Sequence, residues 1–490
     1  MPRFSTRDAS PWLVLVIVCF AQFMVVLDAT ISNVALPSIQ ADLGFSEANL
    51  QWVVNGYTLL FGGFLLLGGR AADLLGRRKL FVAGVALFTL SSLACALATS
   101  EVTLIVARAF QGLGAALVSP AALSIITTTF AEGTERTRAL AIWGGIAAGG
   151  SAVGLLLGGV LTELLSWEWV FLVNVPVGLG VMAVALRLVP ESRVAGAARA
   201  FDLTGAVTVT GGLLLLVYAI VKAEQAGWAS LQTLGLGAIA LALLGGFLAW
   251  EARQAAPLVR VGIFRIRTLA AANAVMLLVV AGLFAMFFFA TIHLQRVLGY
   301  SPLDAGVAFL PVSALILTGS GVSTVLVKRI GPRGTAIFGM TVGAAGLLLL
   351  TQAGPTASYW TDMFPALAIM AFGMGNAFVP LTIIATSGIS DDDAGLASGL
   401  FNTAQQIGGA LGLAVLSTLA ADRTTADLAE LGRAPSLAET NIALVDGFQM
   451  AYVAAAGLLA LGAVLLTVML RRRHLAVIDA EVDEPVAVPA

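Results

Sequence analysis

The chain has few charged residues. Of its 490 residues only 11% are Asp, Glu, Lys or Arg, whereas 59% are hydrophobic, and the mean hydropathy is +0.96. Soluble domains carry about 25% charged residues, so the composition excludes an ordinary soluble protein. A membrane helix needs about 20 apolar residues, and its connection brings the total to about 35, so the chain has room for about fourteen spans. Such a chain is neither a single-span anchor nor an outer-membrane barrel, whose strands alternate apolar and polar residues.

Cysteine and histidine are also scarce. The two cysteines, Cys19 and Cys95, lie in apolar runs, and the two histidines, His293 and His474, are far apart in the sequence. These numbers exclude a disulfide framework and leave too few ligands for a zinc site and too few histidines for a serine–histidine catalytic centre. The net charge of −2 gives no sign of the basic surface that binds nucleic acid. We therefore expect no enzyme, no metal, no cofactor and no nucleic-acid partner.

The apolar runs, read against charged and Pro/Gly breaks, predict an all-α integral membrane protein with fourteen spans. The first run follows Arg3 and Arg7 and is too long for a signal-peptide core of about 7–15 residues, so we expect it to be retained. The expected spans are Trp12–Leu36, Leu50–Gly69, Leu80–Ala98, Val102–Phe130, Ala139–Leu161, Val170–Val189, Leu203–Val221, Leu231–Trp250, Leu269–Leu294, Ala305–Val327, Thr335–Thr351, Met363–Ser387, Leu396–Ala421 and Phe448–Leu470.

The lysines and arginines orient these spans. With the N-terminus in the cytoplasm, 21 of the 26 basic residues fall in cytoplasmic segments and four in outer loops, as the positive-inside rule requires. A miscount of one helix in the middle would destroy this split. We therefore expect both termini to be cytoplasmic and the protein to lie in the cell (plasma or inner) membrane.

A faint repeat at an offset of about 260 residues suggests two related halves. The segment 112–118 (GLGAALV) resembles 373–379 (GMGNAFV), and Gly150 and Gly154 match Gly408 and Gly412. Internal repeats of this kind are common in secondary transporters. The predicted organisation is a six-helix half over 12–189, a segment 190–260 with two inserted helices (about 203–221 and 231–250), a second six-helix half over 261–470, and a cytoplasmic tail over 471–490.

The loop between the second and third spans has the most specific pattern. It contains Gly69, Asp73, Gly76, Arg77 and Arg78. Plain positive-inside topology would explain the basic residues but not the acid or the glycine spacing. The loop resembles the G-x-x-x-D-x-x-G-R-R/K-R/K motif of the major facilitator superfamily. The resemblance implies the fold of that superfamily and a cytoplasmic loop that controls gating, in which the acid pairs with basic and helix-end groups.

The first span carries an acid about two-thirds of the way along its apolar run, at Asp28. A charge at that depth costs several kcal/mol, so a buried acid there indicates a functional, protonatable group. A structural acid satisfied by the nearby Thr30, Ser32 or Asn33 is the alternative. The segment 27–37 (LDATISNVALP) resembles the first-helix motif of the fourteen-helix drug:proton antiporters, which implies proton coupling at Asp28.

The fourth span contains the basic residue Arg108. A guanidinium at this depth must face a cavity or a partner, and a structural clamp on backbone carbonyls is the alternative to a coupling role. The segment from Arg108 to Gly112 (RAFQG) resembles the superfamily's R-x-x-Q-G motif, whose arginine is implied in proton coupling. Since Asp28 and Arg108 are the two opposite charges expected at membrane depth, we expect them to meet, directly or through water.

The fifth span resembles the superfamily's antiporter motif, G-x8-G-x3-G-P-x2-G-G, and departs from it at two positions. The helix-packing glycines Gly150, Gly154, Gly158 and Gly159 are present, but Ala141 stands for the first glycine and Leu155 for the proline. Small residues at these intervals let helices pack closely. The missing proline weakens the argument for antiport.

The remaining polar and aromatic residues of the spans suggest a largely apolar pocket for a bulky amphipathic molecule, cations included. The expected substrate-binding residues are Gln22, Asn33, Asn55, Tyr57, Gln111, Phe284, Phe288, Asn402 and Gln406. We expect a monomeric, proton-driven exporter of drugs, antibiotics or related small molecules that works by alternating access. The alternatives are an exporter of a lipid or a specific metabolite, and a facilitator without proton coupling. A membrane scaffold or sensor would not need Asp28 and Arg108.

Overall fold

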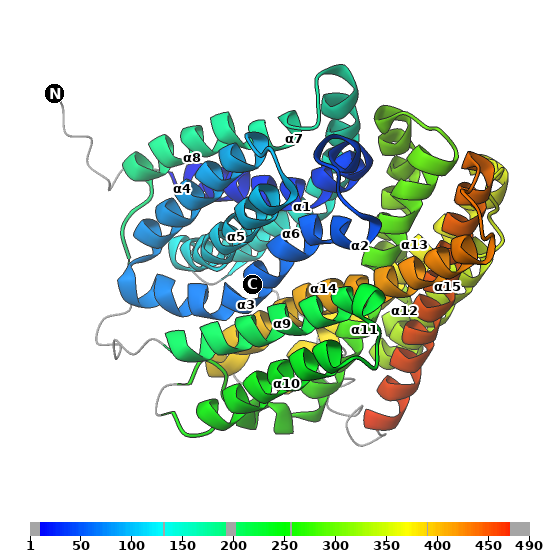
Figure 1. Cartoon of the computed structure of the whole chain (residues 1–490). Coiled ribbons are helices and arrows are strands. Elements are labelled where there is room, and N and C mark those ends of the chain that lie inside the picture. The colour runs from blue at the N-terminus through cyan, green and yellow to red at the C-terminus, as the bar shows by residue number, and fades with distance from the viewer. Residues whose placement is uncertain (1–9, 131–132, 193–201, 255–256, 390, 471–490) are drawn as a thin grey trace. The chain divides into compact units, whose positions relative to one another are not determined.

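The structure is a computed structural model that describes residues 10–130, 133–192, 202–254, 257–389 and 391–470. Within these ranges the chain forms helices and no strand, which confirms the predicted all-helical class (Figure 1). Arg3, Arg7, Arg193, Arg199, His474 and the expected tail over 471–490 lie outside the described residues.

The chain divides into two compact units. The first comprises residues 1–216, 235–258 and 300–310. It contains α1 (Pro11–Leu43), α2 (Glu47–Leu50), α3 (Trp52–Leu75), α4 (Arg77–Ala96), α5 (Glu101–Thr129), α6 (Thr134–Leu164), α7 (Trp169–Leu172), α8 (Asn174–Leu188) and large parts of α9 (Leu203–Ala226) and α10 (Leu231–Glu251).

The second unit comprises residues 217–234, 259–299 and 311–490. It contains the 3₁₀ turn η1 (Val261–Arg265), α11 (Arg267–Ile292), the π-helical turn η2 (His293–Val297), most of α12 (Pro302–Leu350), the π-helical turn η3 (Tyr359–Met363), α13 (Phe364–Thr386), α14 (Asp391–Glu430) and α15 (Leu437–Met469). The predicted boundaries of two halves around inserted helices stay a prediction.

The helices match the fourteen predicted spans. In the described residues twelve helical segments are long and apolar enough to cross a membrane, and a shorter apolar segment, Ala152–Leu164, lies in α6. One of the twelve, α12, contains both the tenth and the eleventh predicted span. Its backbone turns at Gly331, where φ is +74° and ψ is 163°, a conformation that favours glycine. With α12 counted twice and α6 included, every predicted span coincides with a helix.

Local signals in the sequence fix several helix ends. Before α5, the Ser100 hydroxyl accepts a hydrogen bond from the Thr103 amide at 3.3 Å, and Thr103 Oγ1 accepts one from the Ser100 amide at 3.1 Å. Ser436 and Glu439 form the same reciprocal box before α15. Gly44 ends α1 in the left-handed conformation, with φ of +72°.

Glycines allow close helix contacts in both units, and they do so at repeated positions. In the first unit a methyl group at Gly150 of α6 would lie 3.1 Å from Val26 Cγ1 of α1, and one at Gly154 would lie 2.0 Å from Thr30 Oγ1. In the second unit methyl groups at Gly408 and Gly412 of α14 would lie 2.5 Å and 2.1 Å from atoms of α11. The repeat seen in the sequence therefore marks equivalent packing, α6 on α1 and α14 on α11.

The two helices predicted as insertions lie side by side in Figure 1. Gly212 of α9 packs against Leu244 of α10, where an added methyl group would lie 3.0 Å from the leucine side chain. Near one end of the pair, Asp202 accepts hydrogen bonds from the Gly205 amide at 2.7 Å and from Trp250 Nε1 at 3.0 Å. These contacts join α9 and α10 into a hairpin.

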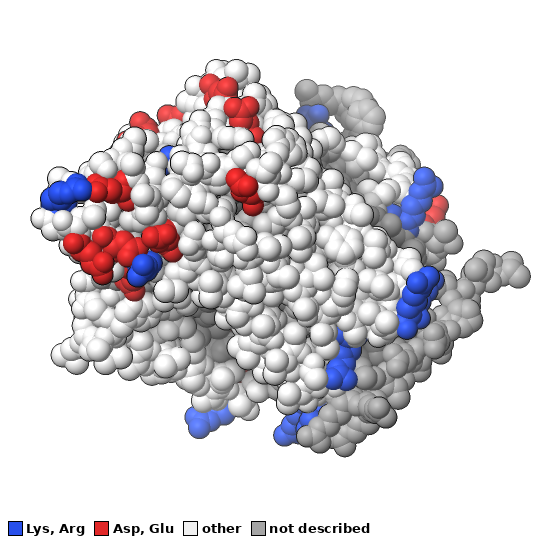
Figure 2. Space-filling view, turned by 90° about the vertical axis from the view of Figure 1, so that its right-hand side faces the viewer, with Lys and Arg blue, Asp and Glu red and all other residues white. Residues whose placement is uncertain are grey.

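Charged side chains are sparse on the face shown in Figure 2. Most of the surface drawn there carries no Lys, Arg, Asp or Glu (Figure 2). A surface of this kind suits contact with lipid.

Candidate functional site: a buried ion pair and its hydrogen-bond partners

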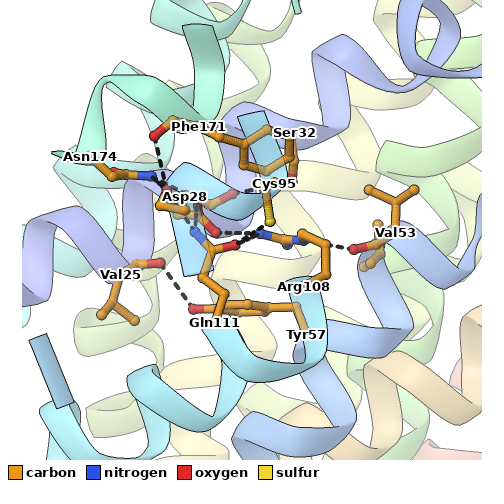
Figure 3. Close-up of polar contacts among 12 residues, drawn as sticks. Val25, Asp28, Ser32, Val53, Tyr57, Cys95, Arg108, Gln111, Phe171 and Asn174 are labelled. Carbon is orange, nitrogen blue, oxygen red and sulfur yellow. Dashed lines mark hydrogen bonds and ion pairs between the residues drawn. The ribbon is translucent and has the colours of Figure 1, made fainter. Parts of the chain in front are cut away.

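The two charges expected at membrane depth are in direct contact. Asp28 lies on α1 and Arg108 on α5, and Arg108 Nη1 donates to Asp28 Oδ2 at 2.5 Å (Figure 3). Both side chains are buried, with exposed fractions of 0% and 1%. Because an isolated buried charge is very costly, each group neutralises the other, and removal of one partner is expected to cost about 3–5 kcal/mol.

Arg108 is held from three directions besides the ion pair. Its Nε donates to the carbonyl of Val53 on α3 at 2.9 Å, and its Nη1 donates to Gln111 Oε1 at 2.7 Å. The guanidinium carbon lies 4.5 Å from the centre of the Tyr57 ring, close enough for a cation–π interaction. The arginine therefore does clamp a backbone carbonyl, one of the two roles expected from the sequence, while it pairs with the acid.

The second carboxylate oxygen of Asp28 receives two amide donors. Gln111 Nε2 of α5 lies 2.7 Å from Oδ1, and Asn174 Nδ2 of α8 lies 2.8 Å from the same atom. Both amides also reach the hydroxyl of Ser92 on α4, each at 3.1 Å. The donors to the carboxylate thus come from α5 and α8, and Ser92 of α4 links the two amides.

The alternative in which neighbours on the same helix satisfy Asp28 does not match this geometry. The Thr30 hydroxyl donates to the Leu27 carbonyl at 3.0 Å, and the Ser32 hydroxyl donates to the backbone carbonyl of Asp28 at 3.2 Å. These side chains bond backbone oxygens instead of the carboxylate.

Close helix packing brings the site together. A methyl group at Gly112 would lie 2.1 Å from the Tyr57 carbonyl, so only glycine lets α5 approach α3 this closely. Gly154 and Gly158 do the same for α6 against α1, on the turns that surround Asp28. The glycines of the predicted packing motif thus support the helix that carries the acid.

Leu155, which replaces the motif's proline, is buried, and its carbonyl lies against Gly306 near the start of α12. Gly159 packs against the same turn, where a methyl group would lie 2.6 Å from the Pro302 carbonyl, and Glu163 accepts a hydrogen bond from the Leu303 amide at 2.9 Å. Because leucine keeps its backbone N–H, α6 continues through this position without the break that a proline would introduce.

The predicted gating loop is mostly helical: its residues form the end of α3 and the start of α4, which Gly76 joins, and they contact the segment after α8. Arg77 N donates to the Ser192 carbonyl at 2.9 Å, Arg78 N donates to Glu191 Oε1 at 3.2 Å, and Arg78 Nε lies 3.8 Å from Glu191 Oε2. Gly76 adopts a φ of +113° beside this carboxylate. Gly69 packs against Pro120 of α5, and the side chain of Asp73 lies outside the described part of the structure.

The residues expected to bind substrate are divided between the two units. In the first unit Gln111 and Tyr57 belong to the ion-pair network, and Gln22 Oε1 accepts a hydrogen bond from Ser119 at 2.9 Å. Asn55 is buried and its Oδ1 has no hydrogen-bond partner among the described residues. Asn33 is partly exposed. In the second unit Phe288 is buried, Phe284 and Gln406 are partly exposed, and Asn402 is exposed.

Sequence reasoning missed three members of the network: Ser92, Asn174 and Cys95. The Cys95 thiol lies 3.6 Å from Gln111 Oε1. All three are neutral, so a search for charges at membrane depth passes over them. A useful signal was available, since a buried acid and arginine must have hydrogen-bond partners.

The described residues contain no group of three His, Cys, Asp or Glu side chains that could hold a metal ion. Both cysteines are free and buried.

The sequence model of the family described as "Major Facilitator Superfamily" matches residues 18–413. The chain belongs to this superfamily. A solved member of similar fold is a bacterial homologue of the human lysosomal transporter Spinster in an inward-facing, unoccupied conformation, with a TM-score of 0.66 and 18% identity over 95% of this chain and 98% of that one. This likeness concerns the fold alone.

Curated relatives of this superfamily member are resistance and export proteins. The puromycin resistance protein of Streptomyces alboniger is 42% identical over 469 residues, which cover 95% of this chain and 92% of that protein. The cephamycin export protein of Amycolatopsis lactamdurans is 44% identical, with 87% and 88% covered. The tetracenomycin C resistance and export protein of Streptomyces glaucescens is 36% identical, with 84% and 76% covered.

Proposed function

We propose that this protein exports antibiotics or other amphipathic small molecules, cations included, in exchange for protons and by alternating access. The observation that carries the proposal is the buried carboxylate of Asp28, paired with Arg108 at 2.5 Å and completed by amide donors from two helices. The relatives named for resistance or export support the direction of transport. The proton gradient is the energy source, and no cofactor takes part.

In the proposed cycle Asp28 exchanges one proton. The ionised carboxylate is neutralised by Arg108, whereas proton binding from outside leaves the guanidinium without a counter-charge. The two states therefore favour different helix arrangements, and substrate and proton each bind better to one of them. The protein works as a monomer in the plasma (inner) membrane, with both termini in the cytoplasm, in agreement with the distribution of lysine and arginine.

The test is transport in everted membrane vesicles with Asp28→Asn, which keeps the size of the side chain but binds no proton. Uptake of a fluorescent cation driven by a pH gradient should fall at least about tenfold, and the remaining flux should not change when the gradient is collapsed. Glu430→Gln, at the exposed end of α14, is the matched control and should transport normally. Undiminished gradient-driven uptake by Asp28→Asn would remove Asp28 from the mechanism.

A facilitator without proton coupling is the second candidate, and Leu155 favours it, because α6 lacks the proline of the antiporter motif. The same vesicles separate the two. A facilitator would move substrate at the same rate with and without the pH gradient in the unmodified protein.

A further inference from the structure

Asn174 is the first residue of α8 and lies outside the ion pair, yet it touches the carboxylate directly. Its Nδ2 lies 2.8 Å from Asp28 Oδ1 and 3.1 Å from Ser92 Oγ, and its exposed fraction is 1%. Figure 3 shows its amide directed at the carboxylate from the side opposite Arg108. A neutral side chain in this position influences whether the acid binds a proton, because its amide donates a hydrogen bond to the carboxylate.

The hydrogen bonds around Ser92 have one consistent direction. Its oxygen lies within reach of both amides, and its hydroxyl donates to the Phe171 carbonyl at 2.9 Å. A hydroxyl has one hydrogen and two acceptor sites, so these three bonds use all of them. The two hydrogens of each amide are then also used, one on Ser92 and one on Asp28 Oδ1.

This assignment favours the ionised carboxylate. Two N–H donors fill both acceptor sites of Asp28 Oδ1, and Oδ2 accepts from the Arg108 guanidinium, so three of the four acceptor sites are taken. A proton that binds on Oδ1 makes one of the two amide donors withdraw. Gln111 is fixed because its own carbonyl oxygen accepts from Arg108 at 2.7 Å. Asn174 has no such link to the arginine in the described structure, so it is the donor that can move away.

The position of Asn174 connects this movement to the junction of two helices. The short helix α7 ends at Leu172 and α8 begins at Asn174, and the residue between them, Val173, keeps a helical backbone conformation. The Ser92 hydroxyl bonds to Phe171 in α7, and Asn174 bonds to Ser92 from α8, so one side chain on α4 holds both sides of the junction. One turn further on, Gly178 lies so close to α4 that a methyl group would stand 1.9 Å from Thr89 Oγ1. This contact keeps Asn174 over Ser92.

We propose that Asn174 is a positioning residue that holds Asp28 in its ionised form, and that proton binding at Asp28 is transmitted through Asn174 and Ser92 to the junction of α7 and α8. The inference rests on the proposed proton exchange at Asp28.

The experiment measures transport by Asn174→Ala across a range of pH, in the full-length protein in vesicles. Loss of one hydrogen bond to the carboxylate makes proton binding easier, so the midpoint of the pH profile should move up by about one unit, a tenfold change in proton affinity. Ser92→Ala, which removes the acceptor that orients both amides, should shift the midpoint in the same direction by less. A loss of packing alone would lower the rate without moving the midpoint.

Asn376→Ala is the matched control. Asn376 is equally buried on α13, and its amide donates only to the Phe372 carbonyl of its own helix in the described structure, so the midpoint should stay in place. If the Asn174→Ala variant does not accumulate in the membrane, the midpoint is measured on Asn174→Ser instead. An unchanged midpoint in the Asn174 variant overturns the inference, provided Asp28→Asn abolishes coupling. If Asp28→Asn keeps coupling, the proposed function itself fails.

Discussion

Arg108 uses both ends of its guanidinium at once. Its Nε bonds the Val53 carbonyl, its Nη1 bonds both Asp28 and Gln111, and its plane lies over the Tyr57 ring. A lysine has a single ammonium at the end of a flexible chain and cannot meet these partners together.

We therefore expect Arg108→Lys to lower gradient-driven transport at least about tenfold, because a hydrogen bond to a charged group contributes about 1.5–3 kcal/mol. Initial rates in everted vesicles, corrected for the amount of protein, measure the effect. Arg138→Lys is the control, since that guanidinium lies 5.4 Å from the Trp12 ring and outside the site. A lysine variant with the rate of the unmodified protein would show that positive charge alone suffices.

At the residue scale the sequence identified the two charges but not their neutral partners. Asp28 and Arg108 stand out because a charge inside an apolar helix is rare and costly. Asn174 and Ser92 do not stand out, because amides and hydroxyls occur throughout these helices and can bond their own backbone. Their role depends on how α4 and α8 are packed, which the order of residues does not give.

Among the helices, the contact of α5 with α3 allows a direct test of glycine packing. An alanine at Gly112 would place a methyl group 2.1 Å from the Tyr57 carbonyl, a backbone atom that cannot move aside alone. Gly112→Ala should therefore lower the free energy of unfolding by about 1–3 kcal/mol and displace Arg108, four residues earlier on the same helix.

Thermal unfolding in detergent measures this loss, and Gly180→Ala is the comparison. Gly180 lies on α8 with no heavy atom within 4 Å of an added methyl group, so its alanine variant should be as stable as the unmodified protein or slightly more so. Equal effects of the two substitutions would contradict the packing argument.

The N-terminus of α4 depends on an acid from a distant part of the chain. Glu191 accepts from the Arg78 amide and lies 3.8 Å from the Arg78 guanidinium, and both side chains are about one-quarter exposed. Glu191→Gln should lower the free energy of unfolding by up to about 1 kcal/mol, and by less at high salt, since exposed pairs are screened. Unfolding at low and high salt checks this, and a loss that is equal at both would point to shape instead of charge.

At the element scale the hydropathy pattern predicted which segments are helical better than where the helices end. The first span was predicted to end at Leu36, before Pro37, but α1 continues to Leu43 and contains the proline. Apolar residues stop where the hydrocarbon ends, whereas backbone hydrogen bonds continue into polar sequence until a signal such as Gly44 stops them. The break at Gly331 was placed correctly because glycine, proline and basic residues coincide there.

For the whole molecule, the proposed topology is open to test at the C-terminus and in an outer loop. A fluorescent protein fused after Ala490 should fluoresce, and alkaline phosphatase fused there should be inactive, because the C-terminus is proposed to lie in the cytoplasm. A phosphatase fused within the outer loop near Lys222 should be active. The opposite pattern at either position would show that the orientation derived from the basic residues is wrong.

The family could be predicted from the sequence, because its motifs are short and local and lie in order along the chain. Gly69 to Lys79 and Arg108 to Gly112 each carry their pattern within a few residues. The site as a set could not, because the residues around Asp28 come from positions up to 146 residues away. The substrate-binding residues were chosen by polarity, a criterion that also selected Gln111, whose amide is already used by the ion pair.

The thiol of Cys95 offers a natural chemical probe of the cycle. It is fully buried, beside Gln111, and buried thiols react slowly with water-soluble reagents. The other cysteine, Cys19, is also buried, so we expect little alkylation of the protein without substitutions while the ion pair stays closed to water. Any state of transport that admits water to the ion pair would expose Cys95, and its alkylation rate would then report, without an added label, how often the site opens.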